Sequence, residues 1–219
     1  RYDWPALLAG ADWLVVSGIT AALGDHALTA LRAAMAAAQA AGVRIAFDTN
    51  FRPSLWQGRE AEAAAILRTL SCEADLLFAG RRAAAMMAGG DFSAGDPDAG
   101  FHAAAQAMFG LSPRLKHIAA TRRDVHSSSR QDLTGLMADR EGLSVSRTTA
   151  LENIIDRVGT GDAFAAGVVH GIATGMARDA TITFAANCAA WAHSVPGDFL
   201  RASLADIAAL GAGGGDVRR

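Results

Sequence analysis

Short apolar runs alternate along the chain with longer segments in which apolar residues recur every three or four positions. The short runs end in glycine or in small polar residues, and they predict buried strands over 12–18, 43–50, 74–80 and 115–121. The longer segments predict helices over 25–42, 59–70, 81–89 and 99–110. Strands that alternate with helices in this way favour a parallel sheet with helices on both faces.

The segment 25–42 has the clearest helix signals at both ends. Asp25 is the expected N-cap, because its carboxylate can accept a free backbone N–H, and Gly42 is the expected stop. Residues that share one side of the helix are expected to face the core: Leu28, Leu31, Met35 and Ala38.

The pattern changes in the second half of the chain. Residues 133–147 contain the turn "DREG" between two apolar runs, which predicts an antiparallel hairpin at the edge of the sheet. Apolar residues spaced by four predict a helix that begins near Thr160, and 182–194 and 203–210 predict two closing helices. We therefore expect one layered α/β domain over residues 1–219.

Composition narrows the class of protein. Hydrophobic residues make up 51% of the chain and charged residues 19%, which indicates a well-buried globular protein. The net charge of −2 comes without a basic stripe, so no nucleic-acid partner is expected. No apolar run reaches about 18 residues, so no membrane association is expected either. We expect a cytoplasmic protein whose sequence is incomplete at its start, since it begins without methionine.

Individual residue types exclude some chemistry. Lys116 is the only lysine, so a Walker-type phosphate loop, which needs a lysine after its glycines, is excluded. Cys72 and Cys188 lie far apart and are expected to be buried, reduced thiols. The six histidines have no metal-binding spacing, so no metal is assigned to side chains.

Polar clusters follow several of the predicted strands. They are 17–20 ("SGIT"), 48–53 ("DTNFRP"), 121–124 ("TRRD") and, before the later helix, 156–162 ("DRVGTGD"). In open α/β sheets ligands bind beyond the carboxyl ends of the strands, so these clusters predict a shared site.

The last cluster combines an anion site with a carboxylate. The first N–H groups of a helix have no intrahelical acceptor, and Gly159 and Gly161 allow an anion to approach them closely. Asp162 would repel a phosphate unless it accepts a proton from an attacking hydroxyl. The alternative is that Asp162 is an N-cap or first-turn acid that stabilises the helix by roughly 1 kcal/mol. A dinucleotide site is not expected, because "GTGDAF" lacks the full GxGxxG and lies late in the chain.

The stretch "DRVGTGDAFAAG" resembles the C-terminal signature D-T-x-G-A-G-D-x-F of the ribokinase (PfkB) family of sugar kinases, and most closely its 2-keto-3-deoxygluconate kinase branch. Other stretches resemble that branch in the same order along the chain: "SGITAAL" (17–23), "DTNFRPSLW" (48–56), "TRRDVHSSS" (121–129) and "HSVPGDF" (193–199). The resemblance covers nearly the whole chain. It implies a ribokinase-like three-layer α/β/α sandwich with a mostly parallel sheet.

The resemblance also implies a role for each matching residue. Asp162 would be the catalytic base, and Gly159, Thr160 and Gly161 would form the anion hole. Arg52 and Gly18 would lie at the substrate, Arg52 reaching a substrate carboxylate or a nucleotide phosphate. The residues implied at the nucleotide are Asn50, Thr121, Arg123, Gly159, Gly161 and, beside adenine, Asn187. Alternatives are a surface ion pair for Arg52, a packing or capping amide for Asn187 and a strand terminator for Gly18.

The implied reaction is ATP-dependent phosphorylation of 2-keto-3-deoxygluconate, with Mg²⁺ bound mainly to the nucleotide and fructose or another ketose as the rival acceptor. Family members often pair, so a homodimer is left open. The chain departs from the family at Arg81 and Arg82, where an Asn-x-x-Glu element is usual, and at Thr160, where alanine is usual. From the resemblance we also expect the N-terminal strands and lid of the family to be absent from this sequence. Thr160 is a tolerable change, whereas the two arginines and the N-terminal departure favour the alternative of a truncated or degenerate kinase fold that binds a nucleotide or a partner without catalysis.

Overall fold

The computed structural model describes residues 2–211, which fall into two compact units. The first unit contains the residues up to 119 together with 138–142, and the second contains 120–137 and the residues from 143 onward. Strand β4 (His117–Val125) begins in the first unit and continues into the second. The single domain and the three layers expected from the sequence stay predictions, and most of the tail "GAGGGDVRR" lies outside the described residues.

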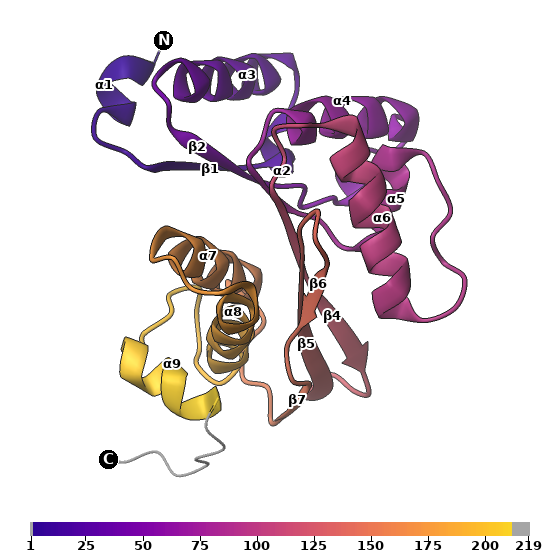
Figure 1. Cartoon of the computed structure of the whole chain (residues 1–219), viewed down its shortest axis with the longest axis vertical. Helices are drawn as coiled ribbons and strands as arrows, with labels where there is room; N and C mark the ends of the chain where they lie inside the picture. Colours follow the sequence, from indigo (N-terminus) through magenta and orange to yellow (C-terminus); the bar gives the residue numbers. More distant parts are fainter. Residues whose placement is uncertain (1, 212–219) are drawn as a thin grey trace. The chain divides into compact units, whose positions relative to one another are not determined.

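The sheet of the first unit consists of parallel strands in the order of the chain (Figure 1). They are β1 (Trp13–Ser17), β2 (Arg44–Asp48), β3 (Leu76–Phe78) and the start of β4. Each lies within a run from which a strand was predicted. Because Ser17 pairs with Asp48 and Asp48 with Phe78, the loops after β1, β2 and β3 leave the sheet at one edge.

The helices of the first unit follow the predicted periodic segments, with two short additions. The four predicted helices are α3 (Asp25–Ala40), α4 (Glu60–Cys72), α5 (Arg81–Ala88) and α6 (Pro97–Leu111). The short helices α1 (Trp4–Leu8) and α2 (Gly18–Ala22) and the 3₁₀ turn Pro53–Leu55 had not been predicted.

Helix α3 corrects one detail of the prediction. Its N-cap is Gly24 with φ 118°, so Asp25 is the first helical residue and not the cap. The Asp25 carboxylate still lies in the first turn, where the helix dipole favours a negative charge. Gly42, with φ 71°, follows the last turn as expected, and the predicted buried face holds at Leu31 and Met35.

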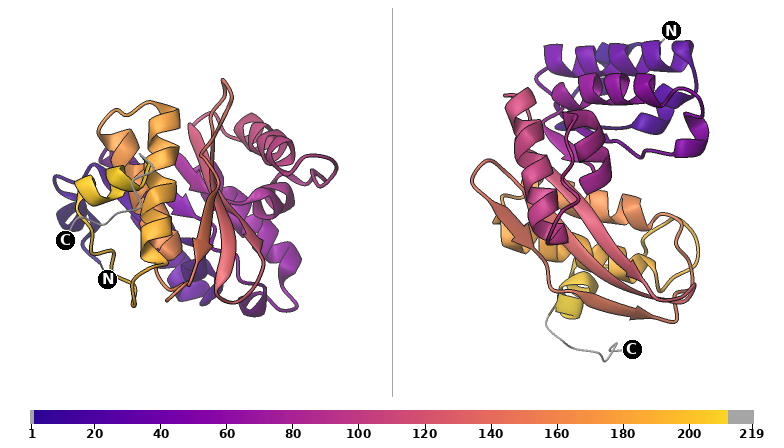
Figure 2. Two further views of the ribbon diagram at one scale, coloured as in Figure 1. Left: turned by 90° about the horizontal axis from the view of Figure 1, so that it is seen from below. Right: turned by 90° about the vertical axis from the view of Figure 1, so that its right-hand side faces the viewer.

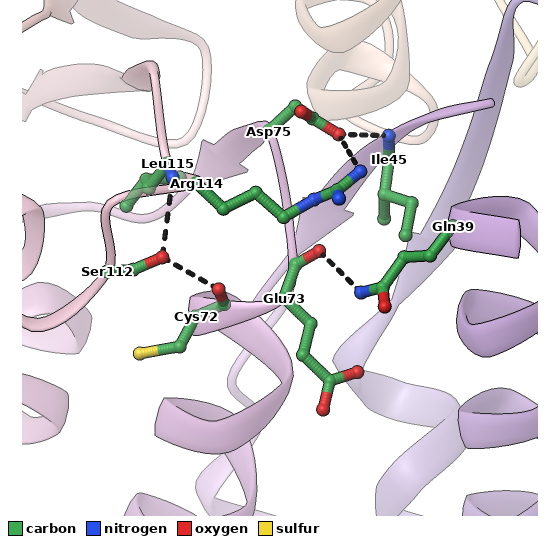
Figure 3. Close-up of polar contacts among 8 residues, drawn as sticks. All are labelled: Gln39, Ile45, Cys72, Glu73, Asp75, Ser112, Arg114 and Leu115. Carbon is green, nitrogen blue, oxygen red and sulfur yellow. Dashed lines mark hydrogen bonds and ion pairs between the residues drawn. The ribbon is translucent and has the colours of Figure 1, made fainter. Parts of the chain in front are cut away.

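A polar cluster ties the segments that precede β3 and β4 to the start of β2, at the end of these strands opposite to the loops that follow them (Figure 3). The buried Asp75 carboxylate accepts hydrogen bonds from the Ile45 N–H at 2.9 Å and from Arg114 Nη2 at 2.7 Å. Nearby, the Ser112 hydroxyl donates to the Cys72 carbonyl at 2.7 Å. Buried polar groups that are satisfied in this way lock the segments that carry them.

Replacing Asp75 by alanine is expected to lower the free energy of unfolding by about 2–4 kcal/mol, because it leaves a buried N–H and a half-buried guanidinium without their acceptor. Urea unfolding followed by circular dichroism measures the change. The control is Glu62→Ala, which breaks an exposed pair with Arg59 in the same unit and should change stability little. Equal effects of the two substitutions would contradict the structural role of Asp75.

The second unit contains the rest of β4 and three further strands. Strand β5 (Arg130–Ala138) lies between β4 and β6 (Leu143–Val145), and β7 (Thr149–Glu152) pairs antiparallel with the start of β5. The predicted turn at 139–142 connects β5 to β6, which is last in the strand order. The prediction placed the start of this hairpin too late and missed β7, because its four residues, TALE, form no apolar run.

Helices α7 (Thr160–Ala173) and α8 (Arg178–Ala192) lie side by side in the second unit, and α9 (Leu204–Gly211) packs on α8 (Figure 1, Figure 2). A Cβ at Gly167 would lie 2.7 Å from the Ala185 Cα, which explains why α7 is rich in glycine and alanine.

Both cysteines are free thiols. Cys188 is buried as expected, and burial raises its pKa to about 11, whereas Cys72 is only half-buried. Over residues 2–211, no helix has the length and apolar character needed to cross a membrane.

Candidate functional site

The glycine-rich turn before α7 presents unpaired backbone N–H groups. Gly159 is the N-cap with φ 72°, and the first helical hydrogen bond runs from the Ala163 N–H to the Gly159 carbonyl at 2.8 Å. The N–H groups of residues 159–162 therefore have no acceptor within the helix. No atom lies within 4 Å of the place where a Cβ of Gly161 would be, so the turn is open on that side. This geometry suits an anion.

Asp162 lies in the first turn of α7 with an exposed side chain. No hydrogen bond or ion pair of its carboxylate to any residue of 2–211 is found. Because the N-cap is Gly159, the alternative that Asp162 is the N-cap is wrong. A first-turn acid that only stabilises the helix remains the alternative to a catalytic base.

Thr160, the residue that departs from the family pattern, is buried, and its hydroxyl donates to the Arg157 carbonyl at 3.0 Å. The hydroxyl hydrogen is therefore used within the turn and is not available to an anion. An anion in the turn would be bound by backbone N–H groups.

Asp156 joins this turn to a second segment, 194–198. Its carboxylate accepts the N–H groups of Arg157 at 2.7 Å, Val158 at 3.0 Å and Gly197 at 2.9 Å. These backbone hydrogen bonds lower the pKa of Asp156. In addition, a Cβ at Gly159 would lie 2.7 Å from the Asp198 carbonyl oxygen, so the two segments are in close contact. Asp156 is part of the sequence motif at 156–162, but no role was predicted for it.

The candidate residues of the first unit lie in the loops after β1 and β2. A Cβ at Gly18 would lie 2.2 Å from the Thr49 carbonyl oxygen, so close approach of these loops requires a glycine there. Asn50, with φ 36°, accepts a hydrogen bond from Arg52 Nε at 3.0 Å. Arg52 is exposed and forms no ion pair with any residue of 2–211, so the expected alternative of a surface ion pair is not found.

Arg81 and Arg82 occupy the first turn of α5, at the same edge of the sheet. Arg82 is exposed, whereas the half-buried Arg81 lies against Gly100. The pKa of Asp91 is lowered by its hydrogen bonds with Ser93 and also by the charge of Arg81. Arg82 is therefore the more accessible of the two guanidinium groups.

Asn187 lies in a cavity of about 230 Å³ in the second unit. Its Nδ2 donates to the Ile207 carbonyl at 3.3 Å, a contact that also fits the alternative of a packing amide. The cavity is lined by residues 146–150 and by Thr183, Ala186, Asn187 and Leu210. Residues 146–150, which carry no motif, were missed in the sequence. Thr121 is half-buried and Arg123 exposed, both on β4.

Within residues 2–211, no three or more His, Cys, Asp or Glu side chains are grouped so that they could hold a metal ion.

Residues 131–201 match the model of the pfkB family of carbohydrate kinases. The fold matches a PfkB family carbohydrate kinase from Listeria grayi with a TM-score of 0.89 and 32% identity, over 97% of this chain and 63% of that one. The family match and the structural neighbours support a PfkB family carbohydrate kinase domain. The family resemblance and the ribokinase-like α/β fold expected from the sequence are thereby confirmed.

Two other proteins that are similar to this chain bear different substrate names. The 2-dehydro-3-deoxygluconokinase of Thermotoga maritima matches with a TM-score of 0.89 and 27% identity, over 96% of this chain and 64% of that one. A fructokinase of Salmonella thompson is 28% identical over 201 residues, which are 89% of this chain and 81% of the relative. The chain thus spans somewhat under two thirds of the length of both solved structures.

Proposed function

We propose that the protein transfers the γ-phosphoryl group of ATP to a hydroxyl group of a keto sugar, with 2-keto-3-deoxygluconate as the preferred acceptor. One observation carries the proposal: the unpaired N–H groups of residues 159–162 lie beside the exposed carboxylate of Asp162. An anion hole next to a free carboxylate is the arrangement that in-line phosphoryl transfer to an alcohol needs.

The proposed positions of the base and of the transferred phosphate lie on two neighbouring helices of the second unit, α8 and α7. The base would occupy the cavity at Asn187 on α8, and the transferred phosphoryl group would bind at the N-terminus of α7. Because Asn187 Nδ2 already donates to Ile207, its Oδ1 is left to accept from the exocyclic amine of adenine. Thr121 and Arg123 on β4 would contact the rest of the nucleotide.

The proposed roles of the remaining residues follow from their chemistry. Asp162 would accept the proton of the attacking hydroxyl, while Gly159, Thr160 and Gly161 would stabilise the charge that develops on the phosphoryl oxygens through their N–H groups. Asn50 would lie at the nucleotide phosphates and Gly18 at the sugar. Mg²⁺ would be held mainly by the phosphates of ATP, whose charge it neutralises when bound.

A coupled assay of ADP release tests the proposal, with 2-keto-3-deoxygluconate, with fructose and without an acceptor. We expect release that depends on the acceptor and is fastest with the acid sugar. Arg82, an exposed cation where family members usually have an acid, favours a second candidate, a fold that binds nucleotide without transfer. Nucleotide binding measured by calorimetry, with no release above the rate without acceptor, would establish this second candidate instead.

Substitution of Arg52 tests the choice of acceptor. Arg52→Ala is expected to raise KM for 2-keto-3-deoxygluconate about tenfold or more, because a charge-assisted, bidentate contact with its carboxylate is lost. KM for fructose, which has no carboxylate, should change little. Arg32→Ala, at an exposed arginine of α3, is the matched control. An equal rise of KM for both sugars would assign Arg52 to the nucleotide phosphates.

A further inference from the structure

His193 lies at the end of α8, where two segments that lead to the glycine-rich turn, 155–159 and 194–198, begin. It is the C-cap residue of α8 and only 2% exposed. Its ring Nδ1 lies 2.7 Å from the Ala189 carbonyl oxygen, and its own carbonyl accepts the Ile155 N–H at 2.9 Å. Because a carbonyl oxygen can only accept, Nδ1 must carry a hydrogen.

Gln131 on β5 completes the hydrogen bonds of this ring. Its Nε2 lies 2.8 Å from His193 Nε2, and the glutamine side chain is fully buried. The Gln131 amide N–H group donates to this ring nitrogen. Nε2 of His193 therefore holds a lone pair, and the imidazole is neutral. Burial lowers the pKa of His193, and so do the charged groups that act on it, Arg123 on β4 and Arg157 in the loop before the turn.

Two segments begin at His193 and its partner Ile155, and they come together again at the glycine-rich turn. One begins where the His193 carbonyl binds Ile155 and runs to Gly159, and the other continues from His193 itself through 194–198. They are rejoined by the hydrogen bond from the Gly197 N–H to Asp156 and by the contact of Gly159 with Asp198. The position of the turn therefore depends on both segments and on the residue where both start.

We propose that His193, held as the Nδ1–H tautomer by Gln131, is a positioning residue for the phosphate-binding turn at Gly159–Gly161. The inference rests on the proposed phosphoryl transfer at this turn. A displaced turn would misplace the N–H groups at the transferred group, while the base cavity would be unchanged. The loss should therefore fall on kcat more than on KM for ATP.

Gln131→Glu gives the sharpest test. The glutamate and His193 would share one proton, which replaces the lost amide N–H, so activity should be kept at low pH. As the pH rises and the pair loses this proton, two lone pairs face each other and activity should fall. The unsubstituted protein should show no such alkaline loss. A loss of activity in Gln131→Glu that does not depend on pH, or no loss at all, would overturn the inference.

Gln131→Leu removes the donor altogether and is expected to reduce kcat about 10- to 100-fold, with less than about a threefold change in KM for ATP. The chain offers a matched control on α6, where Gln106 Nε2 lies 3.0 Å from His102 Nε2. Gln106→Glu and Gln106→Leu should leave kcat and its pH profile unchanged. Effects equal to those at Gln131 would show general destabilisation and overturn the proposal.

Failure of the proposed function can be told apart from failure of this inference. If the unsubstituted protein transfers no phosphate, the proposed function fails. Hydrogen exchange of the Ile155 and Gly197 amides, which donate to the His193 carbonyl and to the Asp156 carboxylate, then decides the inference. Gln131→Leu, but not Gln106→Leu, should speed their exchange at least tenfold, and equal rates would overturn the positioning role.

Discussion

Asp162→Asn is expected to reduce the turnover number at least about 100-fold, because the amide cannot accept the proton of the attacking hydroxyl. The substitution preserves the shape of the side chain, and the exposed site involves no packing that would be lost. The dissociation constant for ATP should therefore stay the same or fall slightly, since a negative charge beside the phosphates is removed. Steady-state kinetics and calorimetric titration with a non-hydrolysable ATP analogue measure the two quantities.

The control for Asp162 is Asp25→Asn, at an exposed acid in the first turn of α3. It removes the same favourable interaction with a helix dipole but no proposed base. Full activity of Asp25→Asn together with inactive Asp162→Asn would support the general base. If Asp162→Asn kept its turnover, the carboxylate would be only a first-turn acid.

Gly159→Ala is expected to reduce turnover about 100-fold, through displacement of the anion hole. Two effects combine at this position. Alanine at φ 72° is strained, and its Cβ would lie 2.7 Å from the Asp198 carbonyl oxygen, in a contact that only movement of the backbone can relieve. Thermal unfolding and steady-state kinetics, measured on the same preparation, record both consequences.

Gly175→Ala separates these two effects. Gly175 has almost the same φ, 74°, but no atom lies within 4 Å of its absent Cβ. The strain of about 1 kcal/mol should therefore appear in both variants, whereas the loss of turnover should appear only at Gly159. Comparable activity of the two variants would show that the contact between Gly159 and Asp198 does not hold the turn.

Elements that carry a hydrophobic period or lie in an apolar run could be predicted from the sequence, and short elements with neither signal could not. The run 43–50 is apolar enough to indicate β2, and the spacing of Phe164 and Val168 placed the start of α7 at Thr160. Helix α2 and strand β7 have five and four residues, and their formation depends on neighbours in the fold. The N-cap of α3 was misassigned because glycine at Gly24 can adopt a positive φ that no sequence pattern reveals.

The candidate site, too, could be predicted from the sequence only in part. The turn at 159–162 is local in the chain, so its free N–H groups follow from the sequence once a helix begins there. The pair Gln131–His193 joins residues 62 apart along the chain, and the cavity at residues 146–150 depends on α8 packing beside β6. Such contacts require the fold.

The close packing of α7 on α8 has a consequence for the choice of phosphate donor. Gly167 lets the two helix backbones touch at Ala185, so the interval between the start of α7 and Asn187 is set by backbone atoms and not by adjustable side chains. Under the proposed function, this rigid interval selects the length of the polyphosphate chain.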